Sequence, residues 1–130
     1  MNSKDEKQNR FYASLAVYSE NDLLDEISRG LGAKPSRSGK KNDYFFWVYS
    51  TKDISPAENI EWHLQHLKST FLDQTQELAR LVNDGKQVRI WIYFGYGGYN
   101  DGFNGSFVLS DEIINWISSF KGDIYVDVWS

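Results

Sequence analysis

Two histidines come closer to a metal site than any other side chains in this chain. His63 and His66 are three positions apart, so on a helix they lie on one side, near enough to share an ion. A third ligand would have to come from a residue such as Glu58, earlier on the same predicted helix, or from a carboxylate of another chain. Histidines at this spacing are more often an ordinary surface or interface pair. We therefore predict no metal site and no cofactor.

Other patterns that carry chemistry are incomplete. Residues 95–98 read Gly-Tyr-Gly-Gly after a predicted strand, but no helix or Lys-Ser pair follows to hold a phosphate. Residues 100–105 are rich in oxygen atoms, yet they lack the alternating acids and terminal glutamate of an EF-hand loop. No Gly-x-Ser-x-Gly elbow is present. We predict no catalytic residues and favour a role other than catalysis.

Composition indicates one acidic domain. The chain has 130 residues, with 18 acidic against 14 basic side chains and a net charge of −4, which disfavours nucleic acid and anionic membranes as partners. It has no cysteine, as is typical of a reducing compartment. No apolar run approaches the roughly 20 residues of a membrane span, and the polar residues 1–10 do not form a secretory signal. We expect a cytoplasmic protein with a flexible tail at residues 1–10 and a single α+β domain at residues 11–130.

The remaining candidates are possible binding residues, and strands and helices must position them. The central element is a predicted strand at residues 87–96. Successive side chains of a strand point to opposite faces. One face here is aliphatic and must pack against helices, whereas the second is aromatic, which is unusual for a face that only meets water. The first face holds Val88, Ile90, Ile92 and Phe94, and the second holds Arg89, Trp91 and Tyr93.

Residues 11–18, 43–50 and 123–129 alternate in the same way. Both faces of residues 43–50 are apolar, and we assign Phe46 and Val48 to the core because of their aliphatic content. The inward side of residues 123–129 is expected to hold Ile124, Val126 and Val128. A short strand at residues 106–109 is expected to form a hairpin with the central strand, and residues 33–42 to form a solvated, basic loop.

Three helices are predicted between these strands. The first follows Ser19 and ends at the glycines of residues 30–32. The second begins at Ser55-Pro56 with a serine cap and a proline in the first turn, and continues for about 27 residues. Its buried stripe is Ile60, Leu64, Leu67, Phe71, Leu78 and Leu81. The third begins at Ser110 and buries Ile113, Ile114 and Ile117.

Three helices and about five strands predict a two-layer α+β sandwich with a largely antiparallel sheet and all helices on one face, a ferredoxin-like variant. Each aromatic side chain on the second face can bury about 150–250 Å², more in sum than the apolar surface that monomers usually expose. We therefore expect this face to bind a partner. The candidate residues are Tyr12, Tyr18, Trp47, Tyr49, Arg89, Trp91, Tyr93, Tyr125, Asp127 and Trp129, with Tyr99, Asp101 and Phe103 of the following loop.

Several spaced motifs resemble a bacterial family, the domain of unknown function 4279. They are Leu31-Gly32 with Pro35, the strand holding Trp47, His63-Leu64 with Leu67, and Asp123-Ile124-Tyr125-Val126. The resemblance covers residues 11–129, although the loop at residues 95–105 is longer and more aromatic than the family implies. It implies a small α+β domain and no established activity.

Protein recognition is the function that these observations favour. Size, acidity and aromatic surface are similar in character to immunity proteins of bacterial toxin systems, and an acidic chain attracts a basic toxin domain. Stacking on RNA bases is disfavoured because Arg89 is the only cation certain to share that face, and Asp127 opposes it. Three alternatives stay open: a homodimer through these faces, a loop that covers the chain's own sheet, and a site for a small ligand or metal-dependent catalysis.

Overall fold

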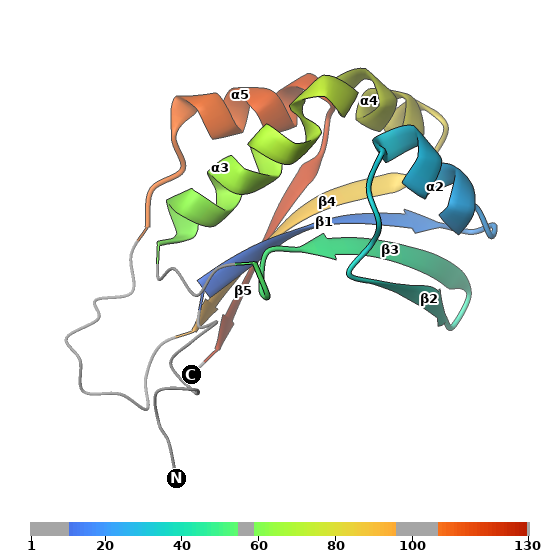
Figure 1. Cartoon of the computed structure of the whole chain (residues 1–130), viewed down its shortest axis with the longest axis horizontal. Coiled ribbons are helices and arrows are strands. Elements are labelled where there is room, and N and C mark those ends of the chain that lie inside the picture. The colour runs from blue at the N-terminus through green and yellow to red at the C-terminus, as the bar shows by residue number, and fades with distance from the viewer. Residues whose placement is uncertain (1–10, 55–58, 96–106, 130) are drawn as a thin grey trace, which may run out of the picture.

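The computed structural model describes residues 11–54, 59–95 and 107–129, and its helices lie together on one side of a curved, open sheet (Figure 1). The strands are β1 (Phe11–Ser19), β2 (Arg37–Lys41), β3 (Tyr44–Ser50), β4 (Gln87–Gly95) and β5 (Asp123–Trp129). The helices are α2 (Leu24–Leu31), α3 (Ile60–Phe71), α4 (Thr75–Asn83) and α5 (Asp111–Ser119), with a 3₁₀ turn, η1 (Leu72–Gln74), between α3 and α4.

The strand order in the sheet is β2-β3-β1-β4-β5. The first four strands pair antiparallel and follow the β-α-β-β-α-β order of ferredoxin-like domains. β5 pairs parallel with β4, which requires a crossover, and α5 provides it. The predicted α+β sandwich is therefore confirmed, with one parallel pair in an otherwise antiparallel sheet.

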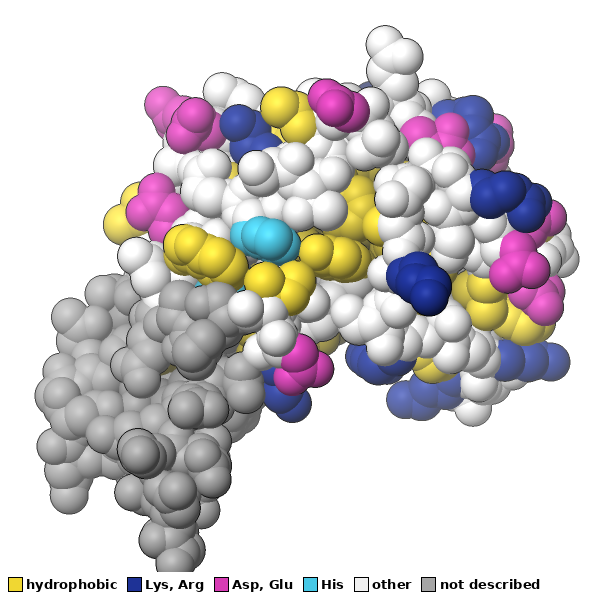
Figure 2. Space-filling view, in the orientation of Figure 1, with side chains coloured by type: hydrophobic (Ala, Val, Ile, Leu, Met, Phe, Trp, Pro, Cys, Tyr) yellow, Lys and Arg dark blue, Asp and Glu magenta, His cyan; other side chains and the backbone are white. Residues whose placement is uncertain are grey.

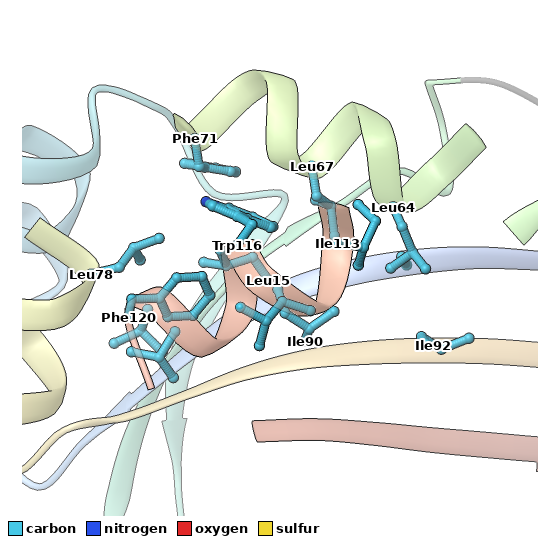
Figure 3. Packing of buried hydrophobic residues seen from close by; sticks show 14 of the residues in the cluster. Leu15, Leu64, Leu67, Phe71, Leu78, Ile90, Ile92, Ile113, Trp116 and Phe120 are labelled. Carbon is cyan, nitrogen blue, oxygen red and sulfur yellow. The ribbon is translucent and has the colours of Figure 1, made fainter. Parts of the chain in front are cut away.

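The hydrophobic core lies between the helices and one face of the sheet (Figure 3). All six residues of the stripe predicted for the second helix are buried. The aliphatic side of β4 is buried as well, with at most 4% of any of its four side chains exposed. The helical layer, including Phe120 just after α5, packs on Leu15, Ile90 and Ile92 of the strands. Its other labelled residues are Leu64, Leu67, Phe71, Leu78, Ile113 and Trp116.

The second helix is interrupted, in contrast to the single helix of about 27 residues expected from the sequence. α3 begins at Ile60, where the Asn59 side chain accepts a hydrogen bond from the Glu61 amide at 2.9 Å; the predicted cap at Ser55-Pro56 lies outside the described residues. At the interruption, Thr75 Oγ1 donates to the Leu72 carbonyl at 2.6 Å and accepts from Trp116 Nε1 at 3.1 Å. The chain bends there, so that α3 and α4 both follow the curved sheet (Figure 1).

The basic segment at residues 33–42 contains a strand, so the prediction of a loop is wrong. β2 pairs antiparallel with β3, and Asn42 and Asp43 form the turn between them. Asn42 has a φ of 55°, a left-handed conformation that asparagine tolerates better than most residues. The hairpin brings Arg37 and Lys41 to the sheet.

The last third of the chain differs from expectation at residues 107–110, at Ile114 and in β5, whose side chains predicted to point inward, Ile124, Val126 and Val128, are 38%, 47% and 52% exposed. Residues 107–110 are not part of a strand, and β4 pairs with β1 and β5 instead of forming the predicted hairpin. Ser110 does cap α5, because its hydroxyl accepts from the Ile113 amide at 3.4 Å. Ile114 is 44% exposed, since it lies about 100° around the helix from Ile113.

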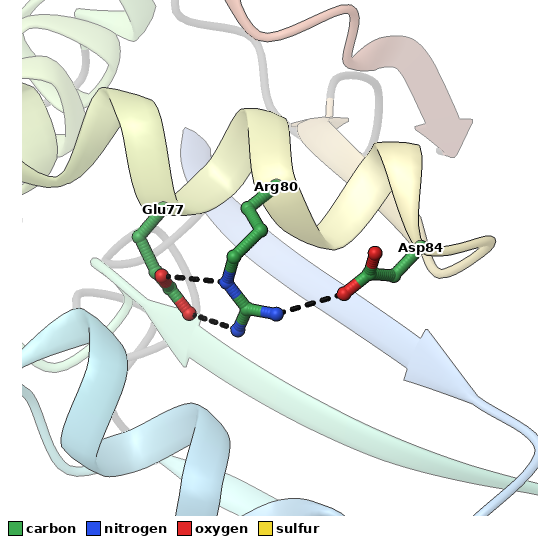
Figure 4. Close-up of polar contacts among 3 residues, drawn as sticks. All are labelled: Glu77, Arg80 and Asp84. Atoms are coloured by element: carbon green, nitrogen blue, oxygen red, sulfur yellow. Dashed lines mark hydrogen bonds and ion pairs between the residues drawn. The ribbon is translucent and has the colours of Figure 1, made fainter.

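Arg80 on α4 bridges two carboxylates (Figure 4). Its guanidinium contacts Glu77 through two hydrogen bonds, the longer at 3.0 Å, and Asp84 through one of 2.8 Å. The hydrogen bonds from Arg80 lower the pKa of Glu77 below its ordinary value of 4.5. Because the pKa of Glu77 is depressed in the folded state, its contribution to stability is present above about pH 4.5 and lost as the pH falls through the folded value.

We predict that Glu77→Gln lowers the urea midpoint slightly near neutral pH and lowers it less near pH 3. The effect is small because Arg80 is exposed and solvent screens the pair. Urea denaturation of both proteins at the two pH values measures it. An equal loss at both pH values would show that the lost contribution is packing and not charge.

Candidate functional site

The side of the sheet opposite the helices carries a continuous set of aromatic rings, which we call the aromatic face: Tyr12, Tyr18, Trp91, Tyr93 and Tyr125. Strand register brings them together, because Tyr12 pairs with Tyr93 across β1 and β4, and Trp91 with Tyr125 across β4 and β5. The Tyr12 and Tyr93 rings stack with centroids 4.3 Å apart, and the Trp91 and Tyr125 rings lie 4.7 Å apart. Trp91 also stacks on Tyr93 at 6.1 Å.

Arg89 is held within this face by two rings. Its guanidinium carbon lies 4.7 Å from the Tyr18 ring centroid and 4.4 Å from that of Tyr125, close enough for cation–π attraction on both sides. One terminal nitrogen donates to Gln87 Oε1 at 2.6 Å, whereas its Nε is buried with no hydrogen-bond partner among the residues that the structure describes. Trp91 Nε1 donates to the Tyr18 hydroxyl at 3.1 Å, so the set is fixed by polar contacts as well as stacking.

Three rings of the aromatic face, those of Tyr18, Trp91 and Tyr93, line a depression of about 760 Å³. This volume lies within the range of pockets that hold small molecules or protruding side chains. Charges of both signs surround the rings, which gives the depression polar groups that can orient a bound molecule. The lining residues are Tyr18, Ser19, Glu20, Arg37, Lys41, Asp43, Tyr44, Phe46, Val48, Gly85, Gln87, Arg89, Trp91, Tyr93 and Asp127.

Comparison with known proteins places the chain in a family. The model of the domain of unknown function DUF4279 matches residues 9–130. The chain belongs to the DUF4279 family. No curated protein and no solved structure is significantly similar to it. None of the helices in the described ranges is long and apolar enough to cross a membrane.

Two residues that the sequence assigned to the binding face of this DUF4279 domain lie on the other side. Trp47 and Tyr49 pair with Val17 and Leu15 of β1, whose side chains point into the core. Trp47 is completely buried, and its Nε1 donates to Ser28 Oγ of α2 at 2.9 Å. The assignment by aliphatic content was wrong because the space beneath α2 and α3 accommodates an indole.

Because β3 faces opposite to the prediction, it contributes residues to the depression that the sequence analysis did not assign to the binding face. Phe46 and Val48 line it, together with Tyr44, and the Arg37 guanidinium carbon of β2 lies 5.4 Å from the Phe46 ring centroid. The sequence signal for Arg37 is the Asn42-Asp43 turn, which makes the basic segment a hairpin partner of β3.

Not all remaining candidates can be placed. Asp127 lines the depression, and Trp129 ends β5 opposite Gly95. Tyr99, Asp101 and Phe103 lie outside the described residues, so their assignment to a binding surface stays a prediction.

The two histidines are part of an aromatic cluster with Tyr49 and Trp62. Figure 2 shows a histidine side chain at the surface beside hydrophobic side chains. His63 is fully buried, with Nδ1 at 2.7 Å from Thr51 Oγ1, and His66 Nε2 lies 3.2 Å from the Tyr49 hydroxyl. Trp62 stacks on His66 at 5.3 Å. Within the described ranges no group of three or more His, Cys, Asp or Glu side chains is placed to hold a metal ion, and Glu58 lies outside them.

Two tyrosines of the aromatic face, Tyr12 and Tyr93, have raised pKa values. Burial raises the pKa of Tyr12 and of Tyr93 above the ordinary value of 10.0, and the nearby charge of Asp127 raises both further. Arg37 opposes this by lowering the pKa of both. Because the folded pKa values are raised, the contribution to stability is present below pH 10.0 and lost as the pH rises through the folded values.

We predict that the free energy of unfolding falls above about pH 10 and falls less steeply in a Tyr12→Phe/Tyr93→Phe double variant, because two of the groups that titrate are then absent. Urea denaturation at intervals between about pH 9 and pH 11 measures both slopes. Identical slopes in the two proteins would show that Tyr12 and Tyr93 do not hold their protons more tightly in the folded state.

Proposed function

We propose that this DUF4279 domain is a non-enzymatic protein-binding module and that the aromatic face is its contact surface. The observation that carries the proposal is the continuous contact of Tyr12, Tyr93, Trp91 and Tyr125 across three strands, on the side of the sheet away from the described helices. Tyrosine, tryptophan and arginine are the residues most enriched among the anchors of protein interfaces.

The shape and rigidity of the aromatic face support a protein partner. Its rings are held by stacking and by the Trp91–Tyr18 hydrogen bond, so little side-chain entropy is lost on binding. A depression of about 760 Å³ receives a protruding loop or helix end of a partner. Arg89 is already fixed between two rings, so its guanidinium presents a preoriented positive charge to a partner.

The partner that we propose is a bacterial toxin domain that this protein neutralises. The net charge of −4 favours association with a basic protein, and Glu20, Asp43 and Asp127 place acidic groups around the depression. An immunity protein acts by occupying its toxin, which requires a preformed surface and no catalytic residues. The aromatic face supplies such a surface.

The proposal is tested with the C-terminal domain of the protein encoded immediately upstream of this chain's gene, which we expect to be the toxin domain. We expect the two proteins to form a stable one-to-one complex in calorimetry, and growth of cells that express the toxin to be restored by this chain. Full toxin activity in the presence of excess protein, together with no measurable binding, would reject the proposal.

A small anionic ligand is the second candidate. Positive charge in the depression favours it, because Arg37, Lys41 and Arg89 line the depression and such groups bind a ligand carboxylate or phosphate. Trp91 lies two residues along β4, so ligand binding would change its fluorescence. A change in emission on titration with carboxylates or phosphates, lost in Arg89→Met, would favour this candidate over the protein partner.

A further inference from the structure

The two edges of the sheet differ in the side chains that protect them. The edge strand β2 carries exposed Arg37, Lys40 and Lys41, and such charges prevent an open edge from pairing with another strand. β5 contains no lysine or arginine. It pairs with β4 on one side, and no other described strand pairs with it.

β5 also exposes aliphatic side chains. Ile124, Val126 and Val128 lie on the helix side of the sheet, because they pair in register with Ile90, Ile92 and Phe94 of β4. In contrast to those three residues, which are at most 4% exposed, the β5 side chains are 38%, 47% and 52% exposed. A seven-residue edge strand with an exposed aliphatic row and no cationic side chain is suited to pairing with a further strand.

We propose that β5 pairs antiparallel with β5 of a second copy of this chain, about a twofold axis that passes beside Val126. The five strands of each copy then form one ten-stranded sheet, with the helices of both copies on one side and the two aromatic faces on the other. This inference goes beyond the proposed function and does not depend on it, since it rests on the unpaired edge of β5; Tyr125 of the aromatic face would lie beside the contact.

The side chains of β5 are complementary to themselves in this register. Val126 lies opposite Val126 of the second copy, and Ile124 lies opposite Val128. The exposed aliphatic side chains therefore form one continuous row of cross-strand pairs. On the other side of the sheet Tyr125 lies opposite Asp127, which places a hydroxyl donor next to a carboxylate. All seven residues from Asp123 to Trp129 find a partner.

Neighbouring registers are less favourable because of the two aspartates. A twofold axis beside Tyr125 places Asp123 opposite Asp127, and one beside Asp127 places that residue opposite itself. Like charges directly opposite each other destabilise a strand pair. A shift by one residue in only one copy would turn its helices to the other side of the sheet. The charge pattern disfavours these two registers, and an axis beside Ile124 or Val128 would leave part of β5 unpaired, so the Val126 register is the most favourable.

Single cysteines test both the contact and its register, because the chain has no cysteine of its own. Opposite residues of antiparallel strands have Cα atoms about 4.5–5.5 Å apart, within the range of a disulfide. We expect Val126→Cys to form a disulfide-linked dimer under mild oxidation. Ile124→Cys alone should not, since its copies lie about 14 Å apart along the strands, whereas a mixture of Ile124→Cys and Val128→Cys should cross-link.

Light scattering of the unmodified protein measures the same contact without oxidation. We expect a particle of twice the 15.1 kDa mass of one chain, and a dissociation constant raised at least about tenfold by Val126→Lys, which places two lysines opposite each other. Leu72→Lys on η1 is the matched control, because Leu72 is 50% exposed and lies away from β5; it should leave the dimer unchanged. Circular dichroism checks that both variants fold.

Three results would overturn the inference. They are a monomer at high protein concentration, a dimer that Val126→Lys does not weaken, and cross-linking by Ile124→Cys alone with none by Val126→Cys. The first would mean that the edge stays unpaired, and the others that the copies meet through another surface or register.

Discussion

Replacing Trp47 by alanine is expected to lower the free energy of unfolding by about 3–5 kcal/mol, the range for loss of a large buried aromatic side chain. The Trp47 side chain is completely buried and packs edge to face on Phe71, with ring centroids 6.4 Å apart. The substitution leaves a cavity between β3, α2 and α3, and it removes the hydrogen bond to Ser28. Urea denaturation measures the loss.

Trp62→Ala is the matched control for this prediction. Trp62 is 39% exposed on α3, so its replacement removes an indole without opening a core cavity, and we expect less than half the loss of stability. Equal losses for the two variants, or a loss below about 1 kcal/mol for Trp47→Ala, would contradict the placement of Trp47 inside the core.

Replacing Trp91 by alanine is expected to weaken binding to the toxin domain at least about 30-fold, or about 2 kcal/mol, as for an interface hot spot. Trp91 lies at the centre of the aromatic face, in contact with Tyr93, Tyr125 and the Tyr18 hydroxyl. Its loss removes contact area and frees the neighbouring rings to move. Calorimetric titration of wild type and variant measures the change in affinity.

Trp62→Ala serves as the control here too, because Trp62 lies on the helix side and away from the aromatic face. We expect its affinity to remain within about threefold of wild type. If both tryptophan variants lose affinity equally, or neither does, the aromatic face is not the contact surface. Unfolding curves of both variants exclude misfolding as the cause.

The sequence predicts which side of β4 faces away from the helices, because the two faces of this strand differ in composition. Val88, Ile90, Ile92 and Phe94 alternate with Arg89, Trp91 and Tyr93, and only the first set can fill a core without polar partners. Strand alternation then decides the direction of every side chain. The structure confirms the whole alternation.

The orientation of β3 was not predictable in this way. Its two faces are both apolar, so alternation leaves two solutions, and side-chain type favoured the wrong one. The pairing of Trp47 with Val17 decides between them, and this contact joins residues 30 positions apart. A buried hydrogen bond to Ser28, which lies on another element, is equally invisible in a local pattern.

The interruption of the long helix also depends on distant residues. Its buried stripe is correctly predicted by helical spacing, yet the bend at η1 is held by Thr75, which accepts a hydrogen bond from Trp116 of α5. The exposure of Val126 likewise depends on the place of β5 at the sheet edge. Strand order, which no local periodicity encodes, sets both the open edge and the width of the aromatic face.

The five tryptophans of this chain provide the most direct test of the aromatic face as the binding surface. Indole N–H resonances, assigned by single substitutions, can be followed by NMR during titration with the toxin domain. We predict that the Trp91 signal shifts or broadens while that of Trp62 stays in place. A shift at Trp62 with no change at Trp91 would contradict the proposal and place the contact on the helix side.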